Sequence, residues 1–146
     1  MRLYRGLKNP YRPELVHSAR RSGTNFTDCP ATALRYAQGS RGVLIVVDIN
    51  VDYDENAGPT RVTKELWLER QASRFMIWGR FDDVITTLLA AKDLRTRLRR
   101  ERLRNAPRET KTFALRAVIE QDLRERALRS KLASRSEFVD RTSSRE

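Results

Sequence analysis

The hydrophobic positions change their period partway along the chain. Up to about residue 85, apolar residues form short runs bounded by Gly, Pro and polar residues, which is typical of strands joined by loops. The clearest run, residues 43–49, is continuous and β-branched and predicts a buried strand. From residue 86 onward, leucines recur at helical spacing among arginines. The pattern therefore predicts an α+β fold, with a small sheet followed by helices.

The first part of the chain contains weaker signals of the same kind. Short apolar stretches between turn residues predict further strands at residues 2–7, 65–68 and 74–78, with 81–85 continuing the sheet. Residues 14–21 predict a short helix. A second helix is expected at 30–37, because Pro30 suits a first helical turn and Gly39 ends the pattern. Residues 50–61 are polar and predict a loop.

The second part predicts two amphipathic helices, residues 88–104 and 111–133, separated by Asn105-Ala106-Pro107. We expect the arginines to face outward and the residues after 139 to form a frayed polar tail. On this basis we divide the chain into a core at 1–88 and a basic helical extension at 89–146. The residues expected to be buried in the helices are Leu94, Leu98, Leu115, Ile119 and Leu123.

Charge sharpens the picture of the second part. The chain carries 30 Lys and Arg against 19 Asp and Glu, a net charge of +11, and residues 91–146 hold 17 basic and 9 acidic residues. Such an excess favours a polyanionic partner, with a solvated helix surface as the alternative. A single Cys29 and a single His17 argue against disulfide frameworks and Cys- or His-rich metal sites. With no membrane-length apolar run and no secretory signal, we expect a cytoplasmic protein.

Three separated motifs stand in a recognisable order. Tyr4-Arg5-Gly6 lies on the first predicted strand, and Phe26-Thr27 leads through Pro30 into a helix that ends at Tyr36-Ala37. The buried strand at 43–49 follows, and then the segment 74–85. Over residues 2–85 this arrangement resembles the ADP-ribosyltransferase family in its Arg–Ser/Thr–Glu branch.

The resemblance implies a split β-sheet that holds NAD in a cleft. Arg5 would contact the NAD phosphates and the nicotinamide ribose, because a guanidinium matches phosphate oxygens. Gly6 would let the backbone approach the nicotinamide amide, and Thr27 would brace Arg5 and the ribose. Tyr36 would pack on the nicotinamide ring. The alternatives are a surface ion pair for Arg5, a plain helix cap for Thr27 and a core position for Tyr36.

The catalytic acid is where the chain departs from the family pattern. The family places a Glu at the start of the late strand, where it stabilises an oxocarbenium-like transition state. That place falls on Arg74 here, or on Gln71 if three residues are inserted. Glu69 precedes Gln71 in a Glu-x-Gln order and ranks first as the charged stabiliser. The other candidates are Asp82 and Asp83, which rank second, and Glu65.

The resemblance implies an NAD-dependent mono-ADP-ribosyltransferase, with NAD as a substrate. The basic C-terminal part favours a nucleic acid or a nucleic-acid-associated protein as the acceptor. Small intracellular enzymes of this kind are often toxins, phage effectors or defence components, so an antitoxin or inhibitor is a candidate partner. The alternative is a non-catalytic basic module, in which a degenerate scaffold of this type binds nucleic acid or an acidic protein.

Overall fold

The computed structural model describes residues 1–8, 24–49, 66–71, 74–79 and 85–143. The predicted helix at 14–21, the loop at 50–61 and residues 81–84 lie outside these ranges. The elements, in chain order, are β1 (Arg2–Leu7), β2 (Thr24–Phe26), α2 (Pro30–Tyr36), β3 (Val43–Asp48), β4 (Leu66–Gln71), β5 (Arg74–Gly79), β6 (Ile85–Ala90), α3 (Ala91–Arg100) and α4 (Arg108–Ser143).

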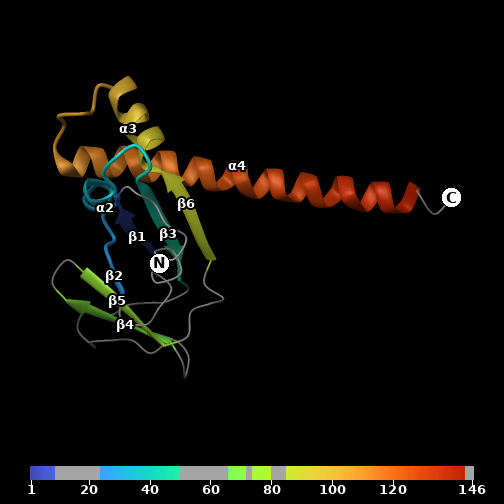
Figure 1. The fold of residues 1–146 in the computed structure, drawn as a ribbon, viewed down its shortest axis with the longest axis horizontal. Coiled ribbons are helices and arrows are strands. Elements are labelled where there is room, and N and C mark those ends of the chain that lie inside the picture. The colour runs from blue at the N-terminus through green and yellow to red at the C-terminus, as the bar shows by residue number, and fades with distance from the viewer. Residues whose placement is uncertain (9–23, 50–65, 72–73, 80–84, 144–146) are drawn as a thin grey trace.

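The strands form two small antiparallel sheets (Figure 1). The first sheet has the order β1-β3-β6 and the second sheet has the order β2-β5-β4. They meet at a bridge in which the backbones of Tyr4 and Thr27 exchange two hydrogen bonds, of 2.7 and 2.9 Å. The three described helices gather at one end of the first sheet, and the second sheet lies toward the opposite end (Figure 1). The predicted α+β class is confirmed.

The first sheet is buried on both faces, which explains the continuous apolar run of β3. Alternate strand residues point to opposite faces. Tyr4, Leu44 and Val46 pack in one core with the helices. Leu3, Ile45 and Val47 pack in a second core with the second sheet, whose buried members include Phe75 and Ile77. The first sheet is therefore the middle layer of the molecule.

The first core also contains the expected helix residues. Leu94, Leu98, Leu115 and Ile119 are buried in it, whereas Leu123 is only partly buried and packs at its margin. The predicted start of the first helix at residue 88 is wrong. Residues 85–90 pair with β3, with Leu88 opposite Ile45. The hydrogen bonds of this ladder use backbone groups that a helix would otherwise pair, so α3 begins only at Ala91. The division that we drew at residue 88 therefore falls inside β6.

Helix α4 is longer than predicted. It has 36 residues and a length of about 54 Å. It runs to Ser143, through most of the segment expected to be a frayed tail. Its second half projects away from the sheets (Figure 1), and Leu128 and Leu132 are 60% and 63% exposed. Ion pairs one turn apart, such as Arg126–Asp122 at 2.9 Å, support the helix where no core covers it.

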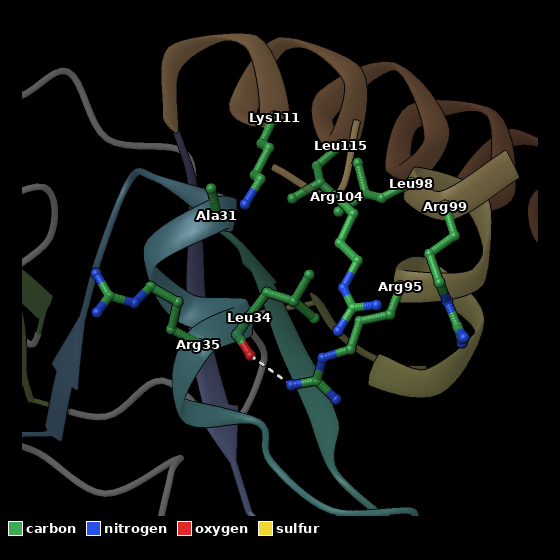
Figure 2. A pocket seen from close by; sticks show the side chains of 9 residues that line it. All are labelled: Ala31, Leu34, Arg35, Arg95, Leu98, Arg99, Arg104, Lys111 and Leu115. Atoms are coloured by element: carbon green, nitrogen blue, oxygen red, sulfur yellow. Dashed lines mark hydrogen bonds between the residues drawn. The ribbon is translucent and has the colours of Figure 1, made fainter. Parts of the chain in front are cut away.

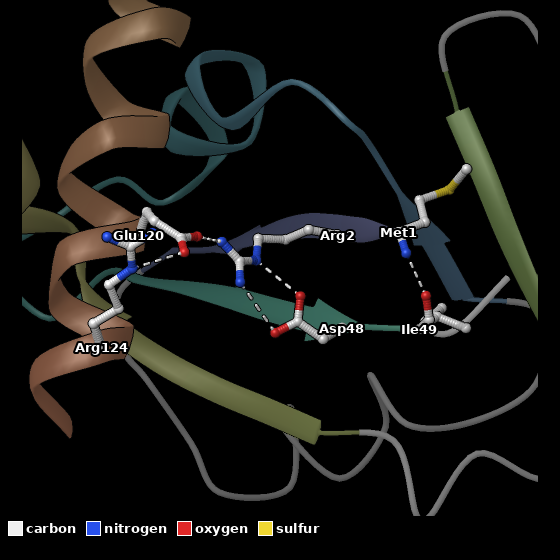
Figure 3. Close-up of polar contacts among 6 residues, drawn as sticks. All are labelled: Met1, Arg2, Asp48, Ile49, Glu120 and Arg124. Carbon is white, nitrogen blue, oxygen red and sulfur yellow. Dashed lines mark hydrogen bonds and ion pairs between the residues drawn. The ribbon is translucent and has the colours of Figure 1, made fainter. Parts of the chain in front are cut away.

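An ion-pair network anchors the first half of α4 to the first sheet (Figure 3). The Arg2 guanidinium contacts Asp48 on β3 at 2.8 Å and Glu120 on α4 at 2.6 Å. These contacts raise the pKa of Arg2, and the Arg2 hydrogen bond and charge hold the pKa of Glu120 below its usual range. The N-terminal ammonium of Met1 donates to the Ile49 carbonyl nearby. No helix in the described ranges has the length and apolarity needed to cross a membrane.

Candidate functional site

A cavity of about 460 Å³ opens between β1, β2 and α2, and we call it the Arg5 cleft. It brings together the four residues that the resemblance assigns to NAD binding. It also includes Arg74, which stands at one of the two places expected for the catalytic Glu. The residues of the cleft that matter here are Arg5, Gly6, Asn25, Thr27, Tyr36 and Arg74.

Arg5 is a partly buried cation with an unused donor. Nη1 donates to the Asn25 carbonyl at 2.8 Å, which holds the guanidinium between β1 and β2. Nε is buried and has no hydrogen-bond partner among the residues that the structure describes. Burial lowers the pKa of Arg5, but a guanidinium keeps its charge at any physiological pH. Arg5 thus offers a positive charge to an anion in the cleft.

Gly6 allows α2 to lie directly against β1. A Cβ atom at this position would stand 2.0 Å from the Ala33 carbonyl oxygen and 2.8 Å from the Ala37 backbone nitrogen. Both contacts are with backbone atoms, so the helix would have to move as a unit. The close approach is what places the Thr32–Tyr36 face of α2 beside Arg5. The structure therefore gives Gly6 a packing role in forming the cleft.

Thr27 and Tyr36 line the cleft in different ways. The Thr27 hydroxyl accepts a hydrogen bond from the Cys29 backbone N–H at 3.1 Å and so fixes the corner before α2. Arg5 makes its described hydrogen bond to Asn25 rather than to Thr27. Tyr36 is 68% exposed, so the alternative that it is a core residue is wrong. Its ring is free to contact a ligand in the cleft.

Contacts from α3 and α4 hold α2 at both ends. At its start, Cys29 Sγ lies 3.2 Å from the Thr112 hydroxyl, and Arg116 donates to the Asp28 carbonyl at 3.1 Å. At its end, Arg95 donates to the carbonyls of Leu34 and Ala37 at 2.9 and 2.6 Å. These partners lie 58 to 88 residues away in the chain. Sequence reasoning missed them because no local pattern marks them.

The polar groups at this junction shift the pKa of the Cys29 thiol. Burial raises the pKa of the thiol, but hydrogen bonds from the Thr112 and Thr32 hydroxyls and from the α2 backbone outweigh it, so the net shift is downward. No group of three or more His, Cys, Asp or Glu within the described ranges could hold a metal ion.

The candidate acids lie on or beyond the second sheet. Glu69 Oε2 accepts a hydrogen bond from the Trp78 indole at 2.9 Å. The cross-strand register aligns Glu69 with Met76 and Met76 with Asn25, so Glu69 shares a sheet face with Asn25 at a separation of about 10 Å. Gln71 pairs through its backbone with Arg74. Glu65, Asp82 and Asp83 lie outside the described residues.

The charge of the cleft follows from this arrangement. Arg5 and Arg74 both line it, and none of its described lining residues is a carboxylate. The cavity is therefore suited to an anion that carries more than one charge, such as a diphosphate.

No family model, curated protein or solved structure matches the chain.

Proposed function

We propose that the Arg5 cleft binds NAD and that the protein is an NAD-dependent mono-ADP-ribosyltransferase. The observation that carries this proposal is the convergence of Arg5, Gly6, Thr27 and Tyr36 on one cavity, although they come from separate motifs. A scaffold that served only to support the helices would need neither a cation with a free, buried Nε nor an exposed tyrosine beside it.

Each cleft residue has a role that suits a dinucleotide. Arg5 and Arg74 supply two positive charges for the diphosphate, and the guanidinium fork of each matches phosphate oxygens. Tyr36 offers an exposed ring for stacking on the nicotinamide. Gly6 keeps α2 close enough for these groups to reach one ligand.

The reaction breaks the bond between the ribose C1′ and the nicotinamide nitrogen. The bonding electron pair leaves with nicotinamide, an acceptor nucleophile forms a new bond to C1′, and the acceptor loses its proton to solvent. Positive charge builds up on the ribose before the new bond forms, so a carboxylate nearby stabilises the transition state. Glu69 is our first candidate because it shares a sheet face with Asn25, and it would have to turn away from Trp78 to act. Asp82 and Asp83 rank second.

One observation favours a second function, a non-catalytic anion-binding module. Arg74 lines the cleft at a place where the resemblance leads us to expect a Glu, and the described lining holds no carboxylate. A cation there opposes positive charge on the ribose. In this alternative the cleft binds NAD or another dinucleotide and leaves its glycosidic bond intact.

Calorimetric titration with NAD tests both functions. We expect wild type to bind, Arg5→Gln to bind about tenfold or more weakly, and Arg5→Lys to recover part of the loss through its charge. Arg41→Gln removes the same charge from an exposed turn outside the cleft and serves as the matched control. An affinity for NAD that Arg5→Gln and Arg41→Gln lower equally would overturn the cleft assignment.

Release of nicotinamide separates the two functions. A transferase frees nicotinamide and adds ADP-ribose to an acceptor, which mass spectrometry of RNA, DNA and protein detects. Glu69→Gln should lower release about a hundredfold while NAD affinity changes little, because the carboxylate acts mainly in the transition state. Binding without any release assigns the binding module.

A further inference from the structure

A second cavity, of about 390 Å³, lies between α2, α3 and the start of α4 (Figure 2), and we call it the basic pocket. Apolar side chains, among them Leu34, Leu98 and Leu115, form part of its wall. The rest of the wall is cationic. Its basic residues are Arg35, Arg95, Arg99, Arg104 and Lys111.

Three of these cations converge in the close-up view. Arg104 and Lys111 extend from the α3–α4 connection and from α4 toward α2, and Arg95 reaches the end of α2 from α3 (Figure 2). Arg95 is fixed by its two bonds to α2 carbonyls. Arg104 and Lys111 have no ion-pair or hydrogen-bond partner within the described part of the chain. Of these three cations, Arg95 is thus anchored, and Arg104 and Lys111 are without such a partner among the described residues.

The excess positive charge of the C-terminal part lies in the segment that supplies four of the basic residues of this pocket. Residues 91–116 contain ten basic and three acidic residues, a net charge of +7. Residues 117–146 contain seven basic and six acidic residues, a net charge of +1. Residues 117–146 are therefore nearly neutral as a whole, and no carboxylate is found among the described residues that line the pocket. Clustered like charges repel one another, and a bound polyanion would remove that repulsion.

The turn between α3 and α4 positions Arg104 at the basic pocket. Arg102 has φ of 58°, a left-handed conformation that usually falls to glycine. Leu103 N–H bonds the Leu98 carbonyl at 2.8 Å and Arg102 N–H bonds the Arg99 carbonyl at 3.0 Å, which is a Schellman motif. The motif turns the chain back over Leu98 and brings Arg104 to the pocket. Strain of about 1 kcal/mol at a non-glycine residue is typical of sites where the geometry is needed.

We propose that the basic pocket binds a backbone phosphate of a single-stranded nucleic acid, and that this strand is the ADP-ribose acceptor; the acceptor role rests on the proposed function. Helix α2 is the shared wall. Thr32 and Tyr36 line the Arg5 cleft, whereas Ala31 and Leu34 line the basic pocket from the opposite face of the helix. An α-helix is about 10 Å across, so a strand lying over α2 can place a phosphate in one cavity and a nucleophilic base or ribose atom at the other.

The chemistry of the pocket favours nucleic acid over an acidic protein. Two arginines and a lysine around one cavity match a phosphate, which offers several acceptor oxygens to guanidinium forks. Leu34 and Leu98 are 6% exposed and can contact the edge of a sugar beside that phosphate, whereas Leu115 is fully buried behind them. We propose a single strand because the bases of a duplex are stacked and cannot present their reactive atoms to a neighbouring cleft.

Fluorescence anisotropy with a labelled single-stranded oligonucleotide of mixed sequence tests the site, with DNA and RNA versions. The test variant is Arg104→Gln with Lys111→Gln. The control is Arg129→Gln with Lys131→Gln, which removes the same charge from exposed residues of the projecting half of α4. We expect the test variant to bind about tenfold or more weakly and its salt dependence to fall by about one unit of slope. The control should bind within about twofold of wild type.

Four results would overturn the proposal. They are equal losses in the test and control pairs, no binding by wild type, tight binding of tripolyphosphate without binding of the oligonucleotide, and binding of poly-glutamate with the same dependence on Arg104 and Lys111. Circular dichroism and the melting temperature check that both variants stay folded. NAD affinity is measured on the same samples. Pocket-dependent oligonucleotide binding in a protein that ignores NAD would retain the phosphate site and refute the proposed function.

Discussion

The two cavities on opposite faces of α2 differ in how the chain builds them. The Arg5 cleft draws most of its described residues from β1, β2 and α2, within the first 36 residues, and Arg74 is the one described lining residue from farther along. The basic pocket draws on α2, α3, the α3–α4 connection and α4. The first is therefore marked by local motifs, while the second exists only once the helices pack. Because α2 is a wall of both, whatever moves this helix changes both cavities.

The largest expected effect is on the free energy of unfolding, and it distinguishes the packed half of α4 from the projecting half. Leu115 is fully buried and belongs to the wall of the basic pocket, whereas Leu128 is 60% exposed. Leu115→Ala should lower the free energy of unfolding by about 2–5 kcal/mol because it leaves a cavity in the core. Leu128→Ala is the matched control and should change it by less than about 0.5 kcal/mol. Urea unfolding measures both, and equal effects would mean that the two halves are packed alike.

This contrast shows what the sequence could predict of the helices. The spacing of Leu94, Leu98, Leu115 and Ile119 predicted their burial, because an amphipathic period needs a core on one side. The same period continues through Leu128 and Leu132, where no sheet is left to cover it. Periodicity alone cannot tell where the covering layer ends. The ion pairs of Glu120 and Asp122 with residues one turn later stabilise the helix just before this uncovered stretch.

Strand β6 shows a second limit of the sequence. Residues 85–90 contain a pair of leucines that fit both a buried strand and the start of a helix. The choice is made by the ladder with β3, which pairs Leu89 with Leu44 and Thr87 with Val46. Such long-range hydrogen bonds leave no local mark, so the helix was predicted to start too early.

The two candidate sites also differ in how far the sequence could predict them. Arg5, Gly6, Thr27 and Tyr36 could be named from short motifs, and the structure brings them to one cavity. The excess of basic residues near the C-terminus could be counted from the sequence. That Arg95, Arg104 and Lys111 line one pocket could not be predicted from it. That depends on the left-handed turn at Arg102 and on Arg95 meeting the end of α2.

The next effect tests whether α2 couples the cavities. Gly6→Ala would place a Cβ 2.0 Å from the Ala33 carbonyl oxygen, so α2 must shift away from β1. We expect a loss of about 3 kcal/mol in unfolding free energy and weaker binding at both cavities, since both use α2 residues. Thermal unfolding and paired titrations with NAD and the oligonucleotide measure the change.

Ser40→Ala, an exposed substitution in the turn after α2, is the control and should change stability by less than about 0.5 kcal/mol. If Gly6→Ala weakened NAD binding alone while the basic pocket kept its affinity, the two cavities would be independent of each other.

The smallest effect concerns the anchor that keeps α4 beside the basic pocket. The Arg2 hydrogen bond and charge hold the pKa of Glu120 below its ordinary value. A carboxyl group with a lowered pKa in the folded state stabilises the fold above its unfolded pKa, and this contribution is lost as the pH falls through the folded pKa. Stability should therefore decline as the pH drops below about 5, and Glu120→Gln should remove part of that decline while slightly destabilising the protein at pH 7. Urea unfolding between acidic and neutral pH measures the slope, with Glu137→Gln, an exposed change on the projecting half of α4, as the control. A slope that Glu120→Gln leaves unchanged would show that the contact with Arg2 does not fasten α4 to the first sheet.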